Sequence, residues 1–179
     1  MKILILVSFI SLSLTQNSIS KKIKRHLEIL GFTKEGAGAI MGNLYAESGL
    51  NPKYYDPRNR STLRMSEDEY VKQANDGSNP GYKKFVLDKV RFGLAGWSRW
   101  NRKQSLLNYC QGHVGDPFCQ IDYLIKELKE DYKILYNSLI NCKNVTECCN
   151  EFLYQFILPM NVHKMYNDRK NYCQTYYNS

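Results

Sequence analysis

The sequence contains few of the residues from which metal sites and several enzyme classes are built. Its 179 residues include only three histidines, each isolated from the others, and no C-x-x-C motif, so the ligand spacing of a zinc site is missing. It also has no glycine-rich phosphate loop, no serine nucleophile elbow and no papain-like cysteine motif, which argues against nucleotide-binding proteins, esterases and thiol proteases. We therefore expect a protein that needs neither a metal ion nor a cofactor.

Long apolar runs are absent outside the N-terminus. The apolar run over residues 3–14 follows Lys2 and is too short to span a bilayer. Small residues follow it near Thr15 and Ser20, and this order predicts a secretory signal peptide over residues 1–20. Residues 21–179 contain no repeat and no low-complexity linker. We expect them to form a single domain of a secreted, monomeric protein that is not inserted in a membrane.

Acidic residues are in the minority. The chain has 17 Asp and Glu against 25 Lys and Arg, which gives a formal net charge of +8. A basic exported protein is attracted to polyanions such as bacterial wall polymers, anionic membranes or nucleic acid, and charge alone does not choose between them. No nucleic-acid-binding motif accompanies the charge, so we expect no nucleic-acid partner.

The cysteines are few but even in number. An even count in an exported chain predicts disulfide bonds, here three, whose connectivity stays open among 15 alternatives. The six are Cys110, Cys119, Cys142, Cys148, Cys149 and Cys173. The two adjacent cysteines are expected to have different partners.

Helical periodicity dominates the sequence after residue 20. Capping patterns mark helix starts at Thr33, at residues 66–69 and at residues 116–117. The last of these predicts a long helix whose apolar face runs over residues 121–139. Strand signals are sparse, so the fold class is mainly α. Two segments are left in which a small β-hairpin could lie, residues 53–64 and 78–92.

One carboxylate, that of Glu47, interrupts the apolar face of the second predicted helix. Helical spacing places it on the same stripe as Ile40 and Leu44, and Gly49 ends the helix just after it. Each glycine in a helix interior costs about 1 kcal/mol relative to alanine, so a helix that tolerates three is expected to pack closely against its neighbours. The three are Gly36, Gly38 and Gly42. This helix is therefore expected to be the central one.

The predicted position of Glu47 suggests a chemical role. Partial burial and the negative end of the helix dipole both favour the protonated form of a carboxyl group. A carboxylic acid that keeps its proton near neutral pH is what a general acid needs to protonate a departing sugar oxygen. The alternative is a salt-bridged or exposed glutamate at a frayed helix end.

Ordered blocks of the sequence carry a family resemblance. The first is GFTKEGAGAIMGNLYAESGLNP, and it is followed by MSEDEYVKQANDG, KKFVLD, FGLAGWSRWNRKQSLL, GDPFCQIDYLIKEL and the closing EFLYQFILP and DRKNYCQTYY. These blocks resemble the phage tail lysozyme family, peptidoglycan-cleaving domains of the lysozyme-like superfamily, and the E-S-x-x-x-P pattern is also similar to that of lytic transglycosylases. The resemblance covers residues 30–177. It implies a lysozyme-like α+β fold with a central buried helix and at most a small β-hairpin, here stabilised by disulfides.

The resemblance also implies site residues. It carries the role of catalytic acid to Glu47 and implies bacterial peptidoglycan as the partner. One position departs from the family, whose members commonly have glutamine in a G-[LI]-x-Q-W stretch where this chain has Gly96. A glutamine there would bond the N-acetyl group of the substrate or the acid itself, so its loss leaves the substrate geometry open. The cysteines are extra to the bacterial pattern and fit secretion.

The identity of a second carboxylate is open. Hydrolysis with inversion needs one about 6.5–9.5 Å from the acid, and hydrolysis with retention needs one about 5–5.5 Å away. Asp88 is the first candidate because it matches an aspartate in the family block, and Asp56 and Asp68 are the alternatives. Without such a base, the muramyl 6-hydroxyl would attack internally and give the anhydro product of a lytic transglycosylase.

A saccharide groove needs flat aromatic surfaces and hydrogen-bond donors around the acid. The aromatic candidates are Trp97, Trp100, Tyr45 and Tyr54. The polar candidates are Asn43, Ser48 and Arg99. For a tryptophan the competing interpretation is a place in the core.

These observations favour a secreted muramidase that cuts peptidoglycan between N-acetylmuramic acid and N-acetylglucosamine. The main alternative is a non-enzymatic cationic protein that binds bacterial walls or membranes, which the glycine at position 96 keeps open. Chitin cleavage is a third hypothesis because chitin shares the N-acetyl sugar. Defence, feeding on bacteria and competition are equally compatible biological roles.

Overall fold

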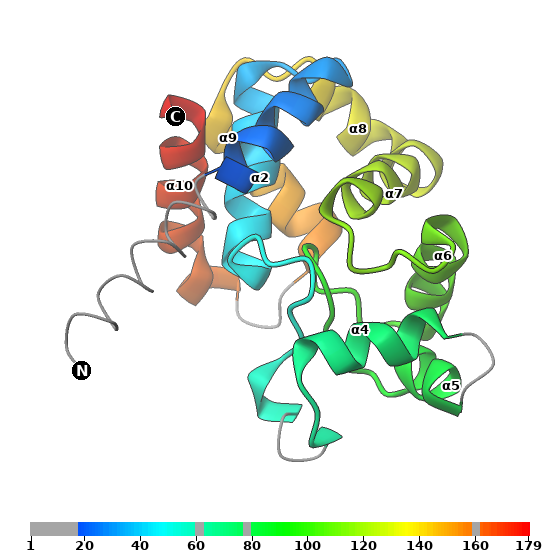
Figure 1. The fold of residues 1–179 in the computed structure, drawn as a ribbon. Helices are drawn as coiled ribbons and strands as arrows, with labels where there is room; N and C mark the ends of the chain where they lie inside the picture. Colours follow the sequence, from blue (N-terminus) through cyan, green and yellow to red (C-terminus); the bar gives the residue numbers. More distant parts are fainter. Residues whose placement is uncertain (1–17, 60–62, 77–79, 159–161) are drawn as a thin grey trace.

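The computed structural model describes residues 18–59, 63–76, 80–158 and 162–179, and most of the predicted signal peptide lies outside them (Figure 1). Residues 18–29 form the first described helix, so residues 18–20 already belong to it. The elements that follow are α2 (Lys34–Ser48), η1 (Pro57–Asn59), α4 (Glu67–Asn75), α5 (Pro80–Leu87), α6 (Trp100–Cys110), α7 (Pro117–Asp131), α8 (Lys133–Ile140), α9 (Val145–Phe152), the π-helical turn η2 (Leu153–Ile157) and α10 (Val162–Asn178). The prediction of a mainly α fold is confirmed.

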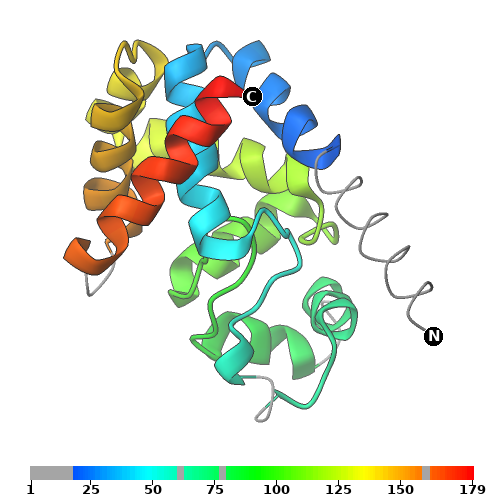
Figure 2. The ribbon, with the colours of Figure 1, turned by 90° about the vertical axis from the view of Figure 1, so that its left-hand side faces the viewer.

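Helix α2 lies at the centre of the helical packing. It contacts α8, α9 and α10, and α10 lies across it in Figure 2. A Cβ atom on Gly36 would overlap the carbonyl oxygen of Leu139 in α8, and one on Gly42 would overlap the backbone nitrogen of Cys173 in α10. The predicted close packing of this glycine-containing helix is therefore confirmed, because its backbone touches the backbones of its neighbours.

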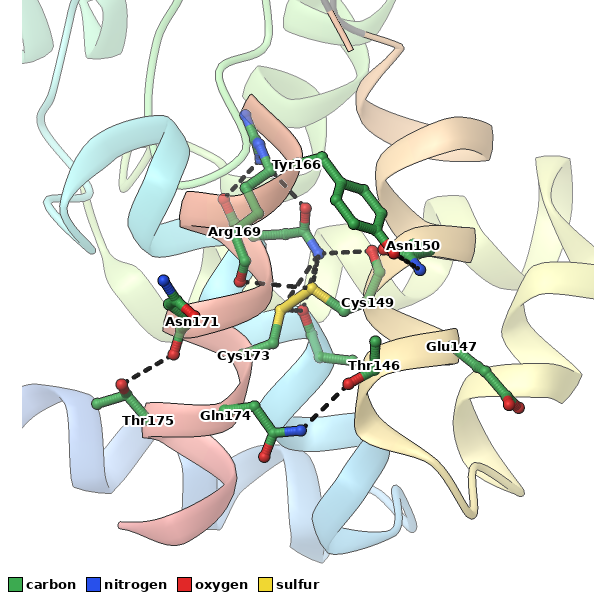
Figure 3. Close-up of a disulfide and its surroundings, with 12 residues drawn as sticks. Thr146, Glu147, Cys149, Asn150, Tyr166, Arg169, Asn171, Cys173, Gln174 and Thr175 are labelled. Atoms are coloured by element: carbon green, nitrogen blue, oxygen red, sulfur yellow. Dashed lines mark hydrogen bonds between the residues drawn. A yellow bond between two sulfur atoms is a disulfide. The ribbon is translucent and has the colours of Figure 1, made fainter. Parts of the chain in front are cut away.

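Three disulfides hold the helices together. They join Cys110 to Cys119, Cys142 to Cys148, and Cys149 to Cys173. The adjacent cysteines at 148 and 149 have different partners, as expected. The third bond links α9 to α10 directly against α2 (Figure 3).

The predicted helix starts agree with the structure, but the predicted long helix does not. The Thr33 hydroxyl accepts from the Gly36 amide at 3.1 Å, and a capping box opens α4 at Ser66. Asp116 caps α7, which ends at Asp131 instead of continuing to residue 139. Residues 129–131 are all charged, so this turn has no apolar side chain to bury, and the break turns α8 toward α2.

The β structure is limited to isolated bridges among the described residues. Tyr55 pairs with Phe92, and Phe92 pairs with Trp97, both in antiparallel orientation. Of the two segments in which a small hairpin could lie, residues 78–92 are taken up mostly by α5 (Pro80–Leu87), a helix that begins with a proline. The pairing instead joins the two predicted segments to each other and closes a tight turn over residues 92–97.

No described helix is both long enough and apolar enough to cross a membrane. Hydrophobic side chains gather in one cluster that includes the first described helix, through the fully buried Ile23 and Leu27, and α2, through Ile40 and Leu44. The end of α2 points from this cluster toward the bridged segments, where Glu47 stands.

We expect Gly42→Ala to destabilise the fold by about 3 kcal/mol, because the added methyl group meets the backbone of α10, which cannot move without shifting the Cys149–Cys173 bond. The control is Gly112→Ala, at a glycine with φ +85° and nothing within 4 Å of the added atom, which should cost only about 1 kcal/mol. Urea unfolding of both variants measures the difference. Equal losses would contradict the close approach of the two helices.

Candidate active site

Glu47 lies in the last turn of α2, on the buried face. Gly49 ends the helix in the left-handed conformation, and its amide donates to the carbonyl oxygen of Tyr45 at 2.7 Å. The side chain of Glu47 is only 3% exposed. The prediction that this carboxylate continues the buried stripe of α2 is confirmed.

One side of the Glu47 carboxylate is held by Arg169 of α10. The Arg169 Nη2 atom donates to Oε1 of Glu47, and its Nη1 atom donates to Oδ1 of Asn43 at 3.1 Å and to the Asn43 carbonyl oxygen at 3.3 Å. Figure 3 shows Arg169 beside the Cys149–Cys173 disulfide. Burial lowers the pKa of Arg169 to about 10, so its guanidinium group is still charged at neutral pH. The Glu47 carboxyl group thus contacts a charged guanidinium group in a place excluded from water.

The other side of the carboxylate meets Arg91. Its Nη2 atom contacts Oε2 of Glu47, and its side chain is 36% exposed. Burial, and then the nearby positive charge of Arg169, lower the pKa of Arg91. Two guanidinium groups favour the ionised form of a carboxyl group. The predicted proton-loaded acid therefore lies between two arginines, which the spacing of residues along the helix did not indicate.

The glycine that departs from the family pattern lies under this ion pair. Gly96 has φ +63°, and a Cβ atom there would lie 2.9 Å from Oε2 of Glu47 and 3.1 Å from Nη2 of Arg91. The guanidinium group of Arg91 occupies the space into which a side chain at position 96 would project. Glycine is therefore required here both by the backbone conformation and by the close approach of Arg91.

Two of the predicted sugar-binding residues support the site instead of lining it. Asn43 is fully buried, and its amide nitrogen donates to the carbonyl oxygens of Ala39 and Cys149, each at 3.0 Å. The hydroxyl of Ser48 lies 3.2 Å from the carbonyl oxygen of Leu94, which ties the end of α2 to the turn that contains Gly96. Asn43 thus orients Arg169, and Ser48 positions the turn.

The two tryptophans have different surroundings. Trp97 is fully buried, and its indole nitrogen donates to Oε2 of Glu127 at 3.1 Å, so the prediction that its ring stacks on a sugar is corrected to a place in the core. Trp100, at the start of α6, is 64% exposed and can offer its ring to a ligand.

Two more of the predicted groove residues differ in exposure. Tyr54 is partly buried, and its carbonyl oxygen accepts from the Gly93 amide. Arg99, before α6, is exposed.

Asp88, the first candidate for a second carboxylate, forms part of a buried polar cluster. Its Oδ1 atom accepts from Nζ of Lys103 at 2.6 Å and from the Val90 amide at 2.8 Å, and its Oδ2 atom accepts from the Tyr70 hydroxyl at 2.6 Å. Lys103 is fully buried. These contacts give Asp88 a structural task, that of neutralising a buried ammonium group.

The register of the bridges favours a different carboxylate. The amide of Asp56 donates to the carbonyl oxygen of Arg91 at 3.1 Å, and Tyr55 pairs with Phe92, so Asp56 and Arg91 lie opposite each other on the same face. Asp56 also accepts from Arg58, which lowers its pKa and keeps it ionised. The third candidate, Asp68, is 79% exposed and pairs with Lys53 at 2.6 Å.

A cavity of about 200 Å³ lies beside the ion pair. It is lined by residues of the last turn of α2 and of the middle of α10, namely Tyr45, Ala46, Asp168, Arg169 and Tyr172. The rings of Tyr45 and Tyr172 meet edge to face with centroids 4.7 Å apart. The predicted aromatic candidate Tyr45 thus lines a cavity with Arg169, the partner of Glu47, and with Tyr172 and Asp168, which the sequence analysis missed.

The described residues offer no group of three or more histidine, cysteine or acidic side chains that could hold a metal ion. What the site contains is a buried carboxylate with one oxygen on a fixed arginine and the other on a partly exposed arginine. Such a group can transfer a proton, or stabilise positive charge, at a ligand that displaces Arg91.

Comparison with known proteins adds one match. A family model described as Phage tail lysozyme matches residues 18–179, which is nearly the whole chain. The match begins with the helix of residues 18–29 and includes the elements that carry Glu47, Arg91 and Arg169. No curated protein and no solved structure matches significantly.

The buried lysine gives a prediction on pH. Burial outweighs the attraction of Asp88 and lowers the pKa of Lys103 from 10.5 to about 8. Between these two values the unfolded chain binds more protons than the folded chain, so the contribution of Lys103 makes the free energy of unfolding rise with pH.

We expect Lys103→Met to lack this rise, and the control Lys22→Met, at an exposed lysine, to keep it. Urea unfolding at several pH values from 7 to 10 measures both. The same pH dependence in the two variants would show that Lys103 titrates normally.

Proposed function

The chain belongs to the phage tail lysozyme family, and on this premise we propose that it is a muramidase that cleaves peptidoglycan between N-acetylmuramic acid and N-acetylglucosamine. Membership indicates a lysozyme-like, peptidoglycan-degrading enzyme. The observation that supports the finer proposal is the buried carboxylate of Glu47 at the end of the central helix, whose partner Arg169 lines a cavity together with Tyr45 and Tyr172. We further propose that the enzyme is secreted, acts as a monomer and lyses bacteria.

The proposed reaction is a general-acid hydrolysis. The protonated Glu47 carboxyl gives its proton to the glycosidic oxygen, and the bond between that oxygen and C1 of N-acetylmuramic acid breaks with its electron pair on the oxygen. Water adds its hydroxyl group to C1, and its remaining proton restores the acid. One water is consumed for each bond cleaved, and no cofactor takes part.

Only one oxygen of Glu47 is available to carry the proton. Oε1 is bound by Arg169, which is itself buried and held by Asn43, whereas Oε2 faces the partly exposed Arg91 and the Cα atom of Gly96. The acid therefore acts through Oε2, after Arg91 has moved away and a proton has been taken up.

For the second carboxylate we propose Asp56. It stands opposite Arg91 in the bridge register, and the guanidinium of Arg58 keeps it ionised, as a base that activates water or a stabiliser of a sugar cation requires. Asp88 is less suited to this role because Lys103, Tyr70 and a backbone amide already engage its two oxygens.

A second function, wall binding without cleavage, is favoured by one observation. In this structure Arg91 covers Oε2 of Glu47, the oxygen that a general acid would use. A protein that kept this contact permanently would bind anionic walls through its net charge of +8 without cutting them.

Glu47→Gln separates the two functions. We expect release of muropeptides from purified walls to fall by about 10²-fold or more, because an amide cannot donate the acid proton, while sedimentation with the walls is retained. The variant also loses stability, because Arg169 stays buried without its charge partner, so urea unfolding first checks that it is folded under the assay conditions. The matched control is Glu28→Gln, at an exposed glutamate of the first described helix. Mass spectrometry of the products reports the cleaved bond and whether water was added. Equal release by the Glu47 variant would refute Glu47 as the acid, and no release by either protein, with both still sedimenting with the walls, would leave only the wall-binding function.

Asp56→Asn and Asp88→Asn test the choice of second carboxylate. We expect the Asp56 variant to lose about 10²-fold in kcat with little change in unfolding, since Asp56 pairs with an exposed arginine. The Asp88 variant should lose about 3 kcal/mol of stability, because it leaves Lys103 buried without its charge partner. Normal kcat in the Asp56 variant, with anhydro products, would assign internal attack by the 6-hydroxyl in its place.

A further inference from the structure

We propose that Arg91 binds a carboxylate of the muramyl unit, and that this exchange uncovers the acid. The proposal rests on the proposed function and deepens it, since it names the group of the substrate that the site recognises. It starts from the contrast between the two arginines that share the Glu47 carboxylate.

The side chain of Arg169 is held in place by burial and hydrogen bonds. Its side chain is 1% exposed, it is bonded to both oxygens of Asn43, and its helix is joined to α9 by the disulfide at Cys173. Displacing it would leave a buried carboxylate and a buried guanidinium without partners, which is strongly destabilising.

The side chain of Arg91 is held less firmly than that of Arg169. Its backbone is fixed by the pairing with Asp56, but its side chain is 36% exposed, and Glu47 is the partner that the described residues give to its guanidinium group. A guanidinium group has five N–H donors in a planar fork, so most of those of Arg91 remain for an incoming ligand. A carboxylate is the ligand whose geometry fits this fork.

The charge of the site also favours an anion. At the Glu47 carboxylate itself, two guanidinium groups, those of Arg91 and Arg169, contact one carboxylate. Arg58 and Asp56 form a separate, neutral pair, and Asp168 lines the cavity beside Arg169. When a carboxylate of the ligand replaces Glu47 on Arg91, one ion pair is exchanged for another. Glu47 then has one cationic neighbour in place of two and takes up a proton more readily at Oε2.

Gly96 leaves room for the reacting oxygen. Arg91 fills the space over this glycine, and position 96 has no side chain of its own to fill it once Arg91 has turned away. The muramyl unit carries such a carboxylate either on its lactyl ether or on its stem peptide, whereas the sugar of chitin has none. The exchange therefore selects muramyl glycans over chitin.

Binding of small sugars tests the proposal without cleavage. The probes are N-acetylmuramic acid, its neutral methyl ester, and muramyl dipeptide, whose carboxylate lies on the stem. We expect the wild-type protein to bind at least one acid about tenfold more tightly than the ester in an NMR titration, and Arg91→Gln to lose this preference. Which acid is preferred distinguishes the lactyl from the stem source. Arg25→Gln, which removes an exposed positive charge on the first described helix, should keep the preference.

Cleavage adds a readout that a purely structural arginine would not change. In Arg91→Gln we expect kcat/KM on peptidoglycan to fall about tenfold while cleavage of chito-oligosaccharides is unchanged or rises, and the alkaline limb of the pH–rate profile to move to higher pH, with Arg91→Lys intermediate. Equal preference for acid and ester in the wild type, or the same preference in Arg91→Gln, would overturn the proposal. A wild type that prefers the acids but releases no muropeptides would instead refute the muramidase function.

Discussion

The buried ion pair between Glu47 and Arg169 is the contact on which the rest of the site depends. Removing two charges from water costs several kcal/mol for each ion, and this is offset only where the remaining donors and acceptors are also satisfied. Asn43 supplies both of its oxygens to Nη1 of Arg169, and Arg91 supplies the second partner of Glu47. Among the side-chain atoms of the described residues, Nε of Arg169 alone is left buried without a hydrogen-bond partner. The Cys149–Cys173 bond and the close approach of α10 to Gly42 keep Arg169 within reach. The packing of the central helix and the chemistry of its last turn are therefore one arrangement.

Absent side chains are as important to this arrangement as the charged ones. At Gly42 the missing Cβ lets α10 approach, and at Gly96 it lets Arg91 lie over the turn and reach Glu47. At Gly93 it makes room for Gln120, whose Oε1 accepts from the Leu94 amide at 2.8 Å and whose Nε2 donates to the carbonyl oxygen of Pro52. A single buried glutamine of α7 thus fixes both the chain that leaves α2 and the turn that faces Glu47.

The sequence allowed the helices and the position of the acid to be predicted, because those depend on local patterns. The caps at Thr33 and Ser66 and the burial of Glu47 follow from spacing within one helix. The partners of Glu47 depend on tertiary contacts, which spacing does not report. Arg169 offered one usable signal, since it stands four residues before a cysteine and so shares its helix face. The sequence around Trp97 or Asp88 is the same whether the residue lies in the core or lines a groove. Only the contact of Trp97 with Glu127 and that of Asp88 with Lys103 show that both have structural roles.

At Gly96, where the family resemblance implies a glutamine, the missing side chain is compensated by Arg91. The space into which a side chain at position 96 would project is filled by Arg91, which arrives from the paired segment and contacts the same carboxylate. A neutral amide in that space would hydrogen-bond to a carboxyl group in either protonation state, whereas a guanidinium group favours the ionised form. Arg91 therefore links protonation of Glu47 to whatever removes the guanidinium group from it, and an anionic ligand, which attracts that group, does so most directly.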